Sequence, residues 1–208
     1  MDCVVVTNGS RPTLLKQTLR SLRENATRAE SHRVVVSWDN GNGACEARNR
    51  GTTLFKQRQE FMMLADDDVY FVPGWDVTLV NALGAMNGLV VSGHAHPFNH
   101  GLGVYKAGGA EFEAAGVLST VHLAMPWSIW DDAGMLHGRG GPGGSEDVEW
   151  CKRVVDLGFG LAVTRPMCVI HCGFTNSVGG ALVGEEHMRK MNDELIELNG
   201  LQGKVIIE

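Results

Sequence analysis

Short apolar runs alternate with amphipathic segments along the first part of the chain. Val4–Val6 and Val34–Val36 are β-branched runs typical of buried strands. Between them, Leu15, Leu19 and Leu22 recur at the i, i+4, i+7 spacing of one helix face. Continuous apolar strands separated by helices predict a mostly parallel sheet covered on both faces, and hence an α/β fold.

The same pattern predicts further elements along the rest of the chain. Helices are predicted at about 44–59 and 77–86 and after Glu146, and strands at 61–66, 88–93, 118–123, 161–164 and 167–170. Residues 97–116 show no clear period and are predicted to form loops or short irregular strands. Ser10 is expected to cap the first helix, with Pro12 in its first turn. A last amphipathic helix is marked by Met188, Met191, Leu195 and Leu198.

Three consecutive carboxylates end the predicted strand at 61–66. We call Asp66, Asp67 and Asp68 the acidic cluster. Burying an unpaired carboxylate costs several kcal/mol, so the cluster is tolerable only where it meets solvent or a cation. It is either a solvated acidic turn or a ligand site. Because parallel strands end at one edge of a sheet, Asn8 and Asp39 are expected to lie beside it.

Composition is that of one folded domain spanning 1–208. Apolar residues make up 44% of the chain and charged residues 20%, and the net charge of −6 argues against a broad nucleic-acid or anionic-membrane surface. No apolar run reaches the roughly 20 residues of a membrane span. The N-terminus has no basic region of the signal-peptide kind.

Cysteine usage gives an expectation about the compartment. The five cysteines are odd in number and form no C-x-x-C pair, although Cys168, His171 and Cys172 leave a zinc site as an alternative. Free thiols predict a reducing compartment, and we expect a cytoplasmic protein.

The order of motifs resembles a known family. A strand with an Asn/Ser-rich loop is followed by a strand ending in Asp39, by Ala47-Arg48-Asn49, by the acidic cluster, and finally by Glu146-Asp147 and Val169-Ile170-His171. This order, from about Val4 to Gly173, resembles family 2-like glycosyltransferases of the GT-A fold. The resemblance implies a Rossmann-like, mostly parallel sheet flanked by helices. It also implies a nucleotide-sugar-binding half at about 1–95, an acceptor half at about 96–173, and a C-terminal loop and helix at 174–208.

The resemblance implies roles for the residues that would hold the donor. Thr7 and Asn8 would line the donor site, and the carboxylate of Asp39 would accept the imide N–H of a uracil or thymine ring. Arg48 would orient the diphosphate, Asp66 would lie against the ribose, and Asp67 would complete the turn or contact the donor. The alternatives are a turn-forming role for Asp39, and for Arg48 a solvated position or an ion pair with the acidic cluster.

A metal site is also implied. Asp68 would hold Mg²⁺ or Mn²⁺, with His171 as a further ligand, and the donor diphosphate would complete the coordination. An imidazole ligand favours Mn²⁺. The alternative for His171 is a hydrogen-bonding residue at a strand end. His94 and His96 share one face of an extended segment, but polar loop histidines are the default there.

The candidate base follows a glycine-rich segment, Gly138–Gly144. Asp147 matches the family's general base, and Glu146 would orient the acceptor or the loop. The alternative for both acids is charge at a helix N-terminus, with Ser145 as the cap. Trp127 and Trp130 would stack on the acceptor or belong to the core.

The resemblance therefore implies an inverting, metal-dependent glycosyltransferase. It would move one sugar from a UDP- or dTDP-sugar to a hydroxyl of a saccharide, a lipid-linked glycan precursor, a protein or a hydroxylated base in DNA. Basic residues in the second half keep the DNA acceptor open: Lys152, Arg153, Arg165, Arg189 and Lys190. The rivals are a metal-dependent nucleotidyltransferase and a non-catalytic nucleotide-sugar-binding module. The shortness of the chain favours a single transfer over processive synthesis.

Overall fold

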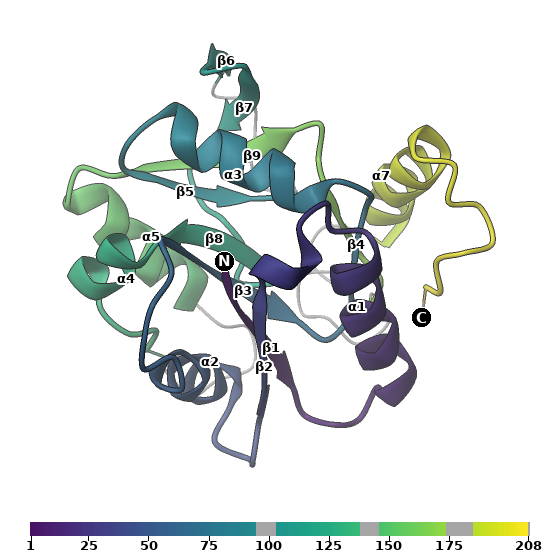
Figure 1. The fold of residues 1–208 in the computed structure, drawn as a ribbon, viewed down its shortest axis with the longest axis horizontal. Coiled ribbons are helices and arrows are strands. Elements are labelled where there is room, and N and C mark those ends of the chain that lie inside the picture. Colours follow the sequence, from purple (N-terminus) through teal and green to yellow (C-terminus); the bar gives the residue numbers. More distant parts are fainter. Residues whose placement is uncertain (95–102, 138–145, 174–184, 208) are drawn as a thin grey trace.

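A mixed eight-stranded sheet forms the centre of the molecule (Figure 1). The computed structural model describes residues 1–94, 103–137, 146–173 and 185–207. The sheet strands are β1 (Asp2–Thr7), β2 (Arg33–Trp38), β3 (Phe61–Asp66), β5 (Leu89–Ser92), β6 (Val104–Ala107), β7 (Ala110–Ala114), β8 (His122–Pro126) and β9 (Gly160–Arg165). Their order is β2-β1-β3-β8-β5-β9-β7-β6. A separate two-stranded sheet pairs β4 (Val69–Phe71) with β10 (Val169–His171).

Most strands of the large sheet run in one direction, as predicted. β1 pairs in parallel with both β2 and β3, and β5 pairs in parallel with β9. β8 lies antiparallel between β3 and β5, and β7 is antiparallel to its neighbours β9 and β6. Within the described residues, β7 and β8 are therefore the two strands that oppose the others.

Helices cover both faces of this sheet (Figure 1). They are α1 (Pro12–Glu24), α2 (Ala44–Thr53), α3 (Trp75–Ala85), α4 (Trp127–Ala133), α5 (Glu146–Asp156) and α7 (Glu185–Leu198), with a 3₁₀ turn at Ala29–Ser31. Alternate residues of β1 face opposite ways. Cys3 and Val5 pack in the core with α1 and α3, whereas Val4 and Val6 pack in the core with α2, α4 and α5. Among the described helices, none has both the length and the apolar character needed to cross a membrane.

Two predicted boundaries differ from the structure. α2 ends at Thr53 instead of about residue 59, because the chain turns there to bury Phe55, whose side chain is 8% exposed. The predicted strand at 118–123 is found later, as β8 at His122–Pro126. The reason is a turn in which the backbone N–H of Val121 donates to the Ser119 hydroxyl (3.3 Å) and that of His122 to the Ser119 carbonyl (3.4 Å).

Two further details concern turns and caps. β6 and β7 form a hairpin around Gly108 and Gly109, whose φ angles of +56° and +82° suit a tight two-residue turn. This hairpin replaces the irregular strands that the sequence predicts at its position. Pro12 does begin α1, but the predicted Ser10 cap is wrong: Arg11 precedes the helix, without a side-chain capping bond. The Ser10 hydroxyl donates instead to Asn8 Oδ1 (2.6 Å).

Candidate active site at the carboxyl edge of the sheet

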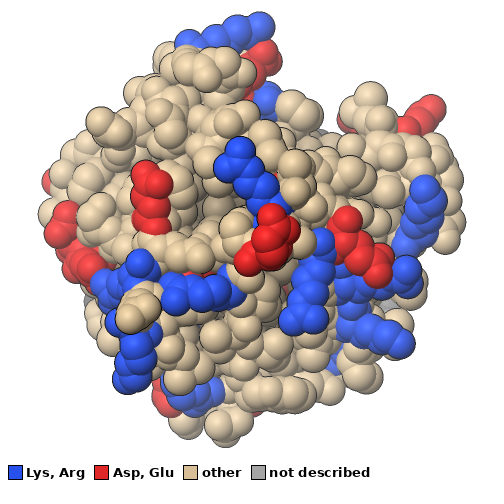
Figure 2. Space-filling view, viewed as in Figure 1, with Lys and Arg blue, Asp and Glu red and all other residues tan. Residues whose placement is uncertain are grey.

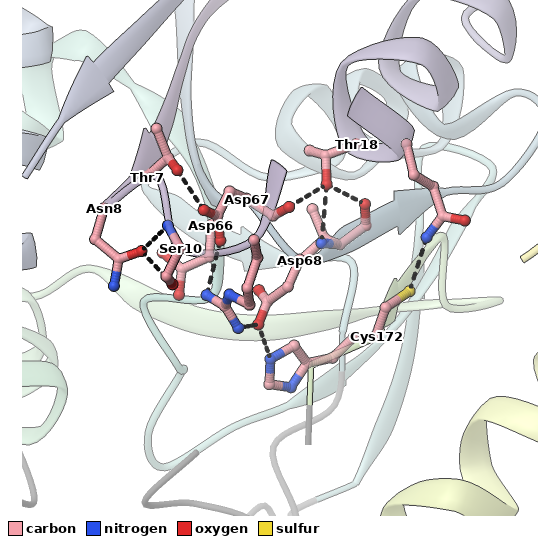
Figure 3. A network of polar contacts seen from close by, with 12 residues as sticks. Thr7, Asn8, Ser10, Thr18, Asp66, Asp67, Asp68 and Cys172 are labelled. Atoms are coloured by element: carbon pink, nitrogen blue, oxygen red, sulfur yellow. Dashed lines mark hydrogen bonds and ion pairs between the residues drawn. The ribbon is translucent and has the colours of Figure 1, made fainter. Parts of the chain in front are cut away.

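The carboxyl ends of β1, β2 and β3 bring the predicted donor residues together (Figure 3). The backbone N–H of Asp39, after β2, donates to the Thr7 carbonyl at 2.7 Å. The Thr7 hydroxyl donates to Asp67, after β3. Thr18 of α1 holds the turn in place, since its hydroxyl bonds the Val69 carbonyl (2.7 Å) and accepts the Val69 N–H (3.1 Å). The expectation that these loops share one edge is confirmed.

The acidic cluster is largely buried and is compensated by two arginines. The side chains of Asp67 and Asp68 are 1% and 3% exposed, and both pair with Arg11. Asp66 pairs with Arg48 at 2.5 Å. A solvated acidic turn is therefore excluded. Carboxylates in this setting require cations beside them, because each unpaired one would cost several kcal/mol.

The cluster's members differ in their ionisation. Burial raises the pKa of Asp66 to about 6, although the charge of Arg48 opposes this rise. Burial also acts on Asp68, but the hydrogen bond and charge of His171, together with the charge of Arg11, outweigh it and hold the pKa of Asp68 below its usual range. Asp68 is thus an ionised carboxylate, the form that binds a divalent cation.

The small β4–β10 sheet brings His171 to the acidic cluster. His171 pairs with Val69, the residue that follows Asp68, and its Nε2 lies 3.2 Å from Asp68 Oδ2. The backbone N–H of Cys172 donates to the Asp68 carbonyl at 2.7 Å, which fixes the end of β10 against the cluster. A Cβ at Gly173 would lie 2.2 Å from Asp68 Oδ2 and 2.5 Å from Arg11 Nη1, so a larger residue here would displace these side chains.

The pair Asp68 and His171 fits part of a metal site. An oxygen and a nitrogen ligand suit Mn²⁺, and Asp68 Oδ1 is buried with no hydrogen-bond partner in the described structure. Across the described ranges, no group of three or more His, Cys, Asp or Glu side chains is arranged to hold a metal. His94 lies near, with its ring centroid 5.7 Å from that of His171, whereas His96 lies outside the described residues.

The candidate base lies in the first turn of α5. Burial raises the pKa of Asp147, and the hydrogen bonds from the side chain and backbone of Thr120, with the charge of Arg48, lower it only in part. One carboxylate oxygen, Oδ1, is buried and has no partner in the described structure. The acidic neighbour Glu146 is partly exposed beside it. The glycine-rich segment and Ser145 lie outside the described residues.

Arg48 interacts electrostatically with both the acidic cluster and the candidate base. Its side chain is 3% exposed, so a solvated position is excluded, and the alternative of an ion pair with the cluster is the one observed. Burial lowers the pKa of the guanidinium, but the carboxylates of Asp66 and Asp147 raise it above its usual value. Nε and Nη1 are buried without partners in the described structure. One buried cation thus interacts electrostatically with carboxylates from both halves of the chain.

Asp39 and Asn8 form local turns at the rim of the site. Oδ1 of Asp39 accepts the N–H groups of Gly41 and Gly43, both at 2.9 Å, and Oδ2 takes no part in these bonds. Oδ1 of Asn8 accepts the N–H of Ser10 at 2.9 Å. The turn-forming role of Asp39 is therefore real, and it leaves one carboxylate oxygen for another partner.

The two tryptophans offered for stacking belong to the core instead. Trp127 and Trp130 are 5% and 3% exposed. The Trp127 indole N–H donates to Asp2 at 3.0 Å, and its ring packs against Phe55 and beneath the Arg58 guanidinium. Because these rings are enclosed at the turn after β8, they offer no open face to an acceptor. The predicted stacking role is corrected to a packing role.

Two residues of this edge were not singled out from the sequence. Trp38, the last residue of β2, is 51% exposed beside Gly9, where a Cβ would lie 3.0 Å from its ring. Arg11 joins Asp67 and Asp68. The sequence feature that could have identified Arg11 is its position in a loop at the same sheet edge as the three carboxylates. The feature that could have identified Trp38 is its position as an aromatic residue directly before Asp39.

Comparisons with known proteins support the fold. No family model matches this sequence, and no curated protein matches it. The structure is similar to a crystal structure of GalNAc-T7 with UDP, GalNAc and Mn²⁺, with a TM-score of 0.65 and 13% identity over 82% of this chain and 43% of that one. It is also similar to the catalytic domain of Drosophila β1,4-galactosyltransferase 7 in complex with xylobiose, with a TM-score of 0.57 and 14% identity over 82% and 69% of the two chains. The chain thus spans less than half of the GalNAc-T7 chain that it matches. It has the GT-A fold of these glycosyltransferases.

Proposed function

We propose that this protein is an inverting, metal-dependent glycosyltransferase that moves one sugar from a nucleotide-sugar donor to an acceptor hydroxyl. The observation that carries the proposal is the buried guanidinium of Arg48, which pairs with Asp66 of the acidic cluster and interacts electrostatically with the separate carboxylate Asp147. A donor-binding cluster and a distant base are the two parts that such a transfer needs. The GT-A fold is consistent with this assignment but does not establish it alone.

In this proposal the first half of the chain, about 1–95, binds the donor. Asp39 Oδ2 accepts the imide N–H of a uracil or thymine ring, and Trp38 stacks on that base. Thr7 and Asn8 form the floor of the donor site, and Asp66 contacts the ribose. A UDP- or dTDP-sugar is therefore the proposed donor. The UDP bound to GalNAc-T7 supports this choice by analogy of fold.

Asp68 and His171 would hold Mn²⁺ or Mg²⁺ at the end of the acidic cluster. When bound, the cation supplies positive charge to the leaving diphosphate. Asp68 is suited to this role because its pKa is held low, and His171 because its Nε2 lies beside the same oxygen. The Mn²⁺ bound to GalNAc-T7 favours Mn²⁺ here.

Asp147 takes the proton of the acceptor hydroxyl. Attack from the face opposite the leaving group inverts the anomeric centre and requires one base on the acceptor side. Of its two oxygens, Oδ1 has no partner in the described structure, and it is the one proposed to take the proton. Glu146, partly exposed next to it, orients the acceptor in the second half of the chain, 96–173.

The contacts of basic residues favour a glycan acceptor over DNA. Lys152 pairs with Asp156, and Arg165 with Glu113. Arg153 donates to the carbonyls of Ala133 (2.5 Å) and Met135 (2.7 Å). On the face drawn in Figure 2, Lys and Arg side chains are interspersed with Asp and Glu. A DNA backbone would need cations that are not already engaged in this way.

The rivals are weakened by the same geometry. A nucleotidyltransferase needs a basic, glycine-rich loop after the first strand to hold a triphosphate, but residues 7–11 hold one glycine, Gly9, and one cation, Arg11. A binding module without catalysis needs no buried carboxylate with a raised pKa outside the donor site, and Asp147 is one.

A screen of nucleotide sugars tests the proposal directly. We expect a UDP- or dTDP-sugar to raise the melting temperature only when Mn²⁺ or Mg²⁺ is present, because the diphosphate completes the metal site. Slow metal-dependent hydrolysis of the same donor should accompany the shift. GDP-sugars and samples with EDTA serve as controls. If no nucleotide sugar changes the melting temperature with either metal, the proposal is wrong.

The pH dependence of the transfer gives a second test. Asp147 acts as a base only when ionised, and burial raises its pKa, so activity should fall on acidification at a pH above the usual aspartate range. The Thr120 hydroxyl lowers this pKa, so Thr120→Val should move the acidic limb of the kcat profile to higher pH. Ser119→Ala is the matched control, because that hydroxyl bonds the Val121 N–H. An acidic limb that stays in place in Thr120→Val would separate Asp147 from the proton transfer.

A further inference from the structure

Arg11 places a positive charge inside the acidic cluster. Its Nη2 lies 2.7 Å from Asp67 Oδ1, and its Nη1 bonds Asp68 Oδ2. The two carboxylates are almost fully buried, whereas the Arg11 side chain is 33% exposed. Arg11 stands just before α1, and its side chain makes no capping bond to the helix. The side chain is thus held at its tip by the carboxylates and is open to solvent along part of its length.

The guanidinium and the proposed metal compete for one oxygen atom. Asp68 Oδ2 bonds Arg11 and also lies 3.2 Å from His171 Nε2. A Cβ at Gly173 would lie 2.5 Å from Arg11 Nη1, so the guanidinium fills the space against the backbone beside this oxygen. A cation that takes His171 Nε2 and the carboxylate oxygen nearest to it as ligands would lie next to Asp68 Oδ2. The guanidinium already occupies one side of it.

Electrostatics does not favour both cations together. An arginine stays protonated at any physiological pH, so Arg11 cannot lose its charge to make room. Two cations a few ångströms apart in a partly buried site repel strongly. A diphosphate, in contrast, is a bidentate partner that a guanidinium binds well. The guanidinium of Arg11 therefore has an alternative anionic partner, the diphosphate, when metal and nucleotide bind together. It has none when the metal binds alone.

We propose that Arg11 is a resident counter-ion of the metal site. It excludes a divalent cation from Asp68 in the free protein and transfers to the donor's diphosphate when the metal–nucleotide complex binds. This inference rests on the proposed function and adds to it an order of binding: nucleotide is required for tight metal binding because it draws Arg11 away from Asp67 and Asp68.

Binding of Mn²⁺ alone tests the inference without any measurement of transfer. Free Mn²⁺ is followed by its electron paramagnetic resonance signal during titration of the wild type, Arg11→Met and Arg11→Lys. Arg11→Met should bind Mn²⁺ at least about tenfold more tightly than the wild type, since a change of 1.4 kcal/mol suffices for that factor. Arg11→Lys keeps the charge and should stay close to the wild type. Arg20→Met, which removes an exposed α1 arginine paired with Glu24, should not change the affinity.

The coupling between metal and nucleotide should change as well. UDP should tighten Mn²⁺ binding by the wild type, and this effect should shrink in Arg11→Met, where no counter-ion has to be displaced. If Arg11→Met binds Mn²⁺ alone no more tightly than the wild type does, the inference is wrong. A different outcome separates the two proposals: UDP fails to tighten Mn²⁺ binding by the wild type, but Arg11→Met still binds the metal more tightly. In that case the proposed function is wrong, whereas competition between Arg11 and the metal for Asp68 is supported.

A second pair of variants keeps the test interpretable if Arg11→Met folds poorly. Arg11→Met leaves two buried carboxylates without their cation, so the fold could be weakened. Asp67→Asn removes one of these charges. Comparing Asp67→Asn with Arg11→Met/Asp67→Asn isolates Arg11 in a less acidic background. The double variant should again bind Mn²⁺ more tightly than its parent, and equal affinities in this pair would overturn the inference.

Discussion

Replacing Asp147 by asparagine is expected to lower kcat by about 10²–10⁴-fold, the usual contribution of a general base. Asparagine has nearly the shape of aspartate and can still accept the hydrogen bonds from Thr120, so α5 should keep its place. What it loses is the capacity to take a proton from the acceptor. The melting-temperature shift caused by a nucleotide sugar with metal should therefore be nearly unchanged.

The measurement pairs single-turnover transfer with donor binding for each variant. Glu146→Gln should change the KM for the acceptor more than kcat, because Glu146 is proposed to orient the acceptor. Asp156→Asn at the other end of α5 is a matched control: it removes an exposed carboxylate that pairs with Lys152. An Asp147→Asn variant that turns over at the wild-type rate would remove Asp147 from the role of base.

The donor half could be predicted well because its signals are local. β1, β2 and β3 are continuous apolar strands, and each ends in a polar loop. In such strands burial on both faces fixes the parallel arrangement, and the arrangement fixes which loops meet. The proximity of the loops that carry Asn8, Asp39 and the acidic cluster thus followed from the pattern alone.

The second half could not be predicted in the same way, because tertiary contacts decide it. β8 is antiparallel, and its start depends on a turn at Ser119 that has no strong sequence signal. The β6–β7 hairpin is marked only by Gly108 and Gly109. The sequence does not distinguish a buried from an exposed aromatic residue after a strand. In the structure both tryptophans of α4 are buried in the core.

The site shows the same division between local and long-range information. The three aspartates are visible in the sequence, but the residues that neutralise them are far away along the chain. Pairing of β10 with β4 brings His171 to Asp68, and only the family resemblance suggested that neighbour. Arg11 lies in a turn-rich loop, where a charged residue is ordinarily solvated. Its ion pairs form because the residue just before α1 lies next to Asp67 and Asp68.

Arg48→Met is expected to destabilise the protein by about 2–3 kcal/mol. Removing one partner of a fully buried ion pair typically costs about 3–5 kcal/mol, and the value is reduced here because Asp66 is partly exposed (23%). For a chain of 208 residues this corresponds to a fall in melting temperature of roughly 5–10 °C. Methionine fills much of the same volume, so the loss should reflect the charge and not a cavity.

Thermal and urea unfolding of four proteins would identify the cause of this loss of stability. They are the wild type, Arg48→Met, Arg50→Met and Arg48→Met/Asp66→Asn. Arg50→Met is the matched control on α2, because Arg50 is a more exposed arginine (37%) that pairs with Glu46 at 3.8 Å; it should cost less than about 1 kcal/mol. Arg48→Met/Asp66→Asn removes both charges of the buried pair and should recover part of the stability. If the double variant is less stable than Arg48→Met, the loss does not come from an uncompensated Asp66.

Arg48→Met should also change two properties of the proposed reaction, the pH dependence of kcat and the affinity for the donor. A variant that only lowers stability would change neither. Arg48 lowers the pKa of Asp66 and of Asp147, so without it both carboxylates become harder to ionise. The acidic limb of kcat should then move to higher pH, and donor affinity at neutral pH should fall. Because Arg50→Met leaves both carboxylates untouched, the acidic limb of kcat should not move in that variant. A shift of only one of the two properties would mean that Arg48 serves a single half, and that the link between donor site and base lies elsewhere.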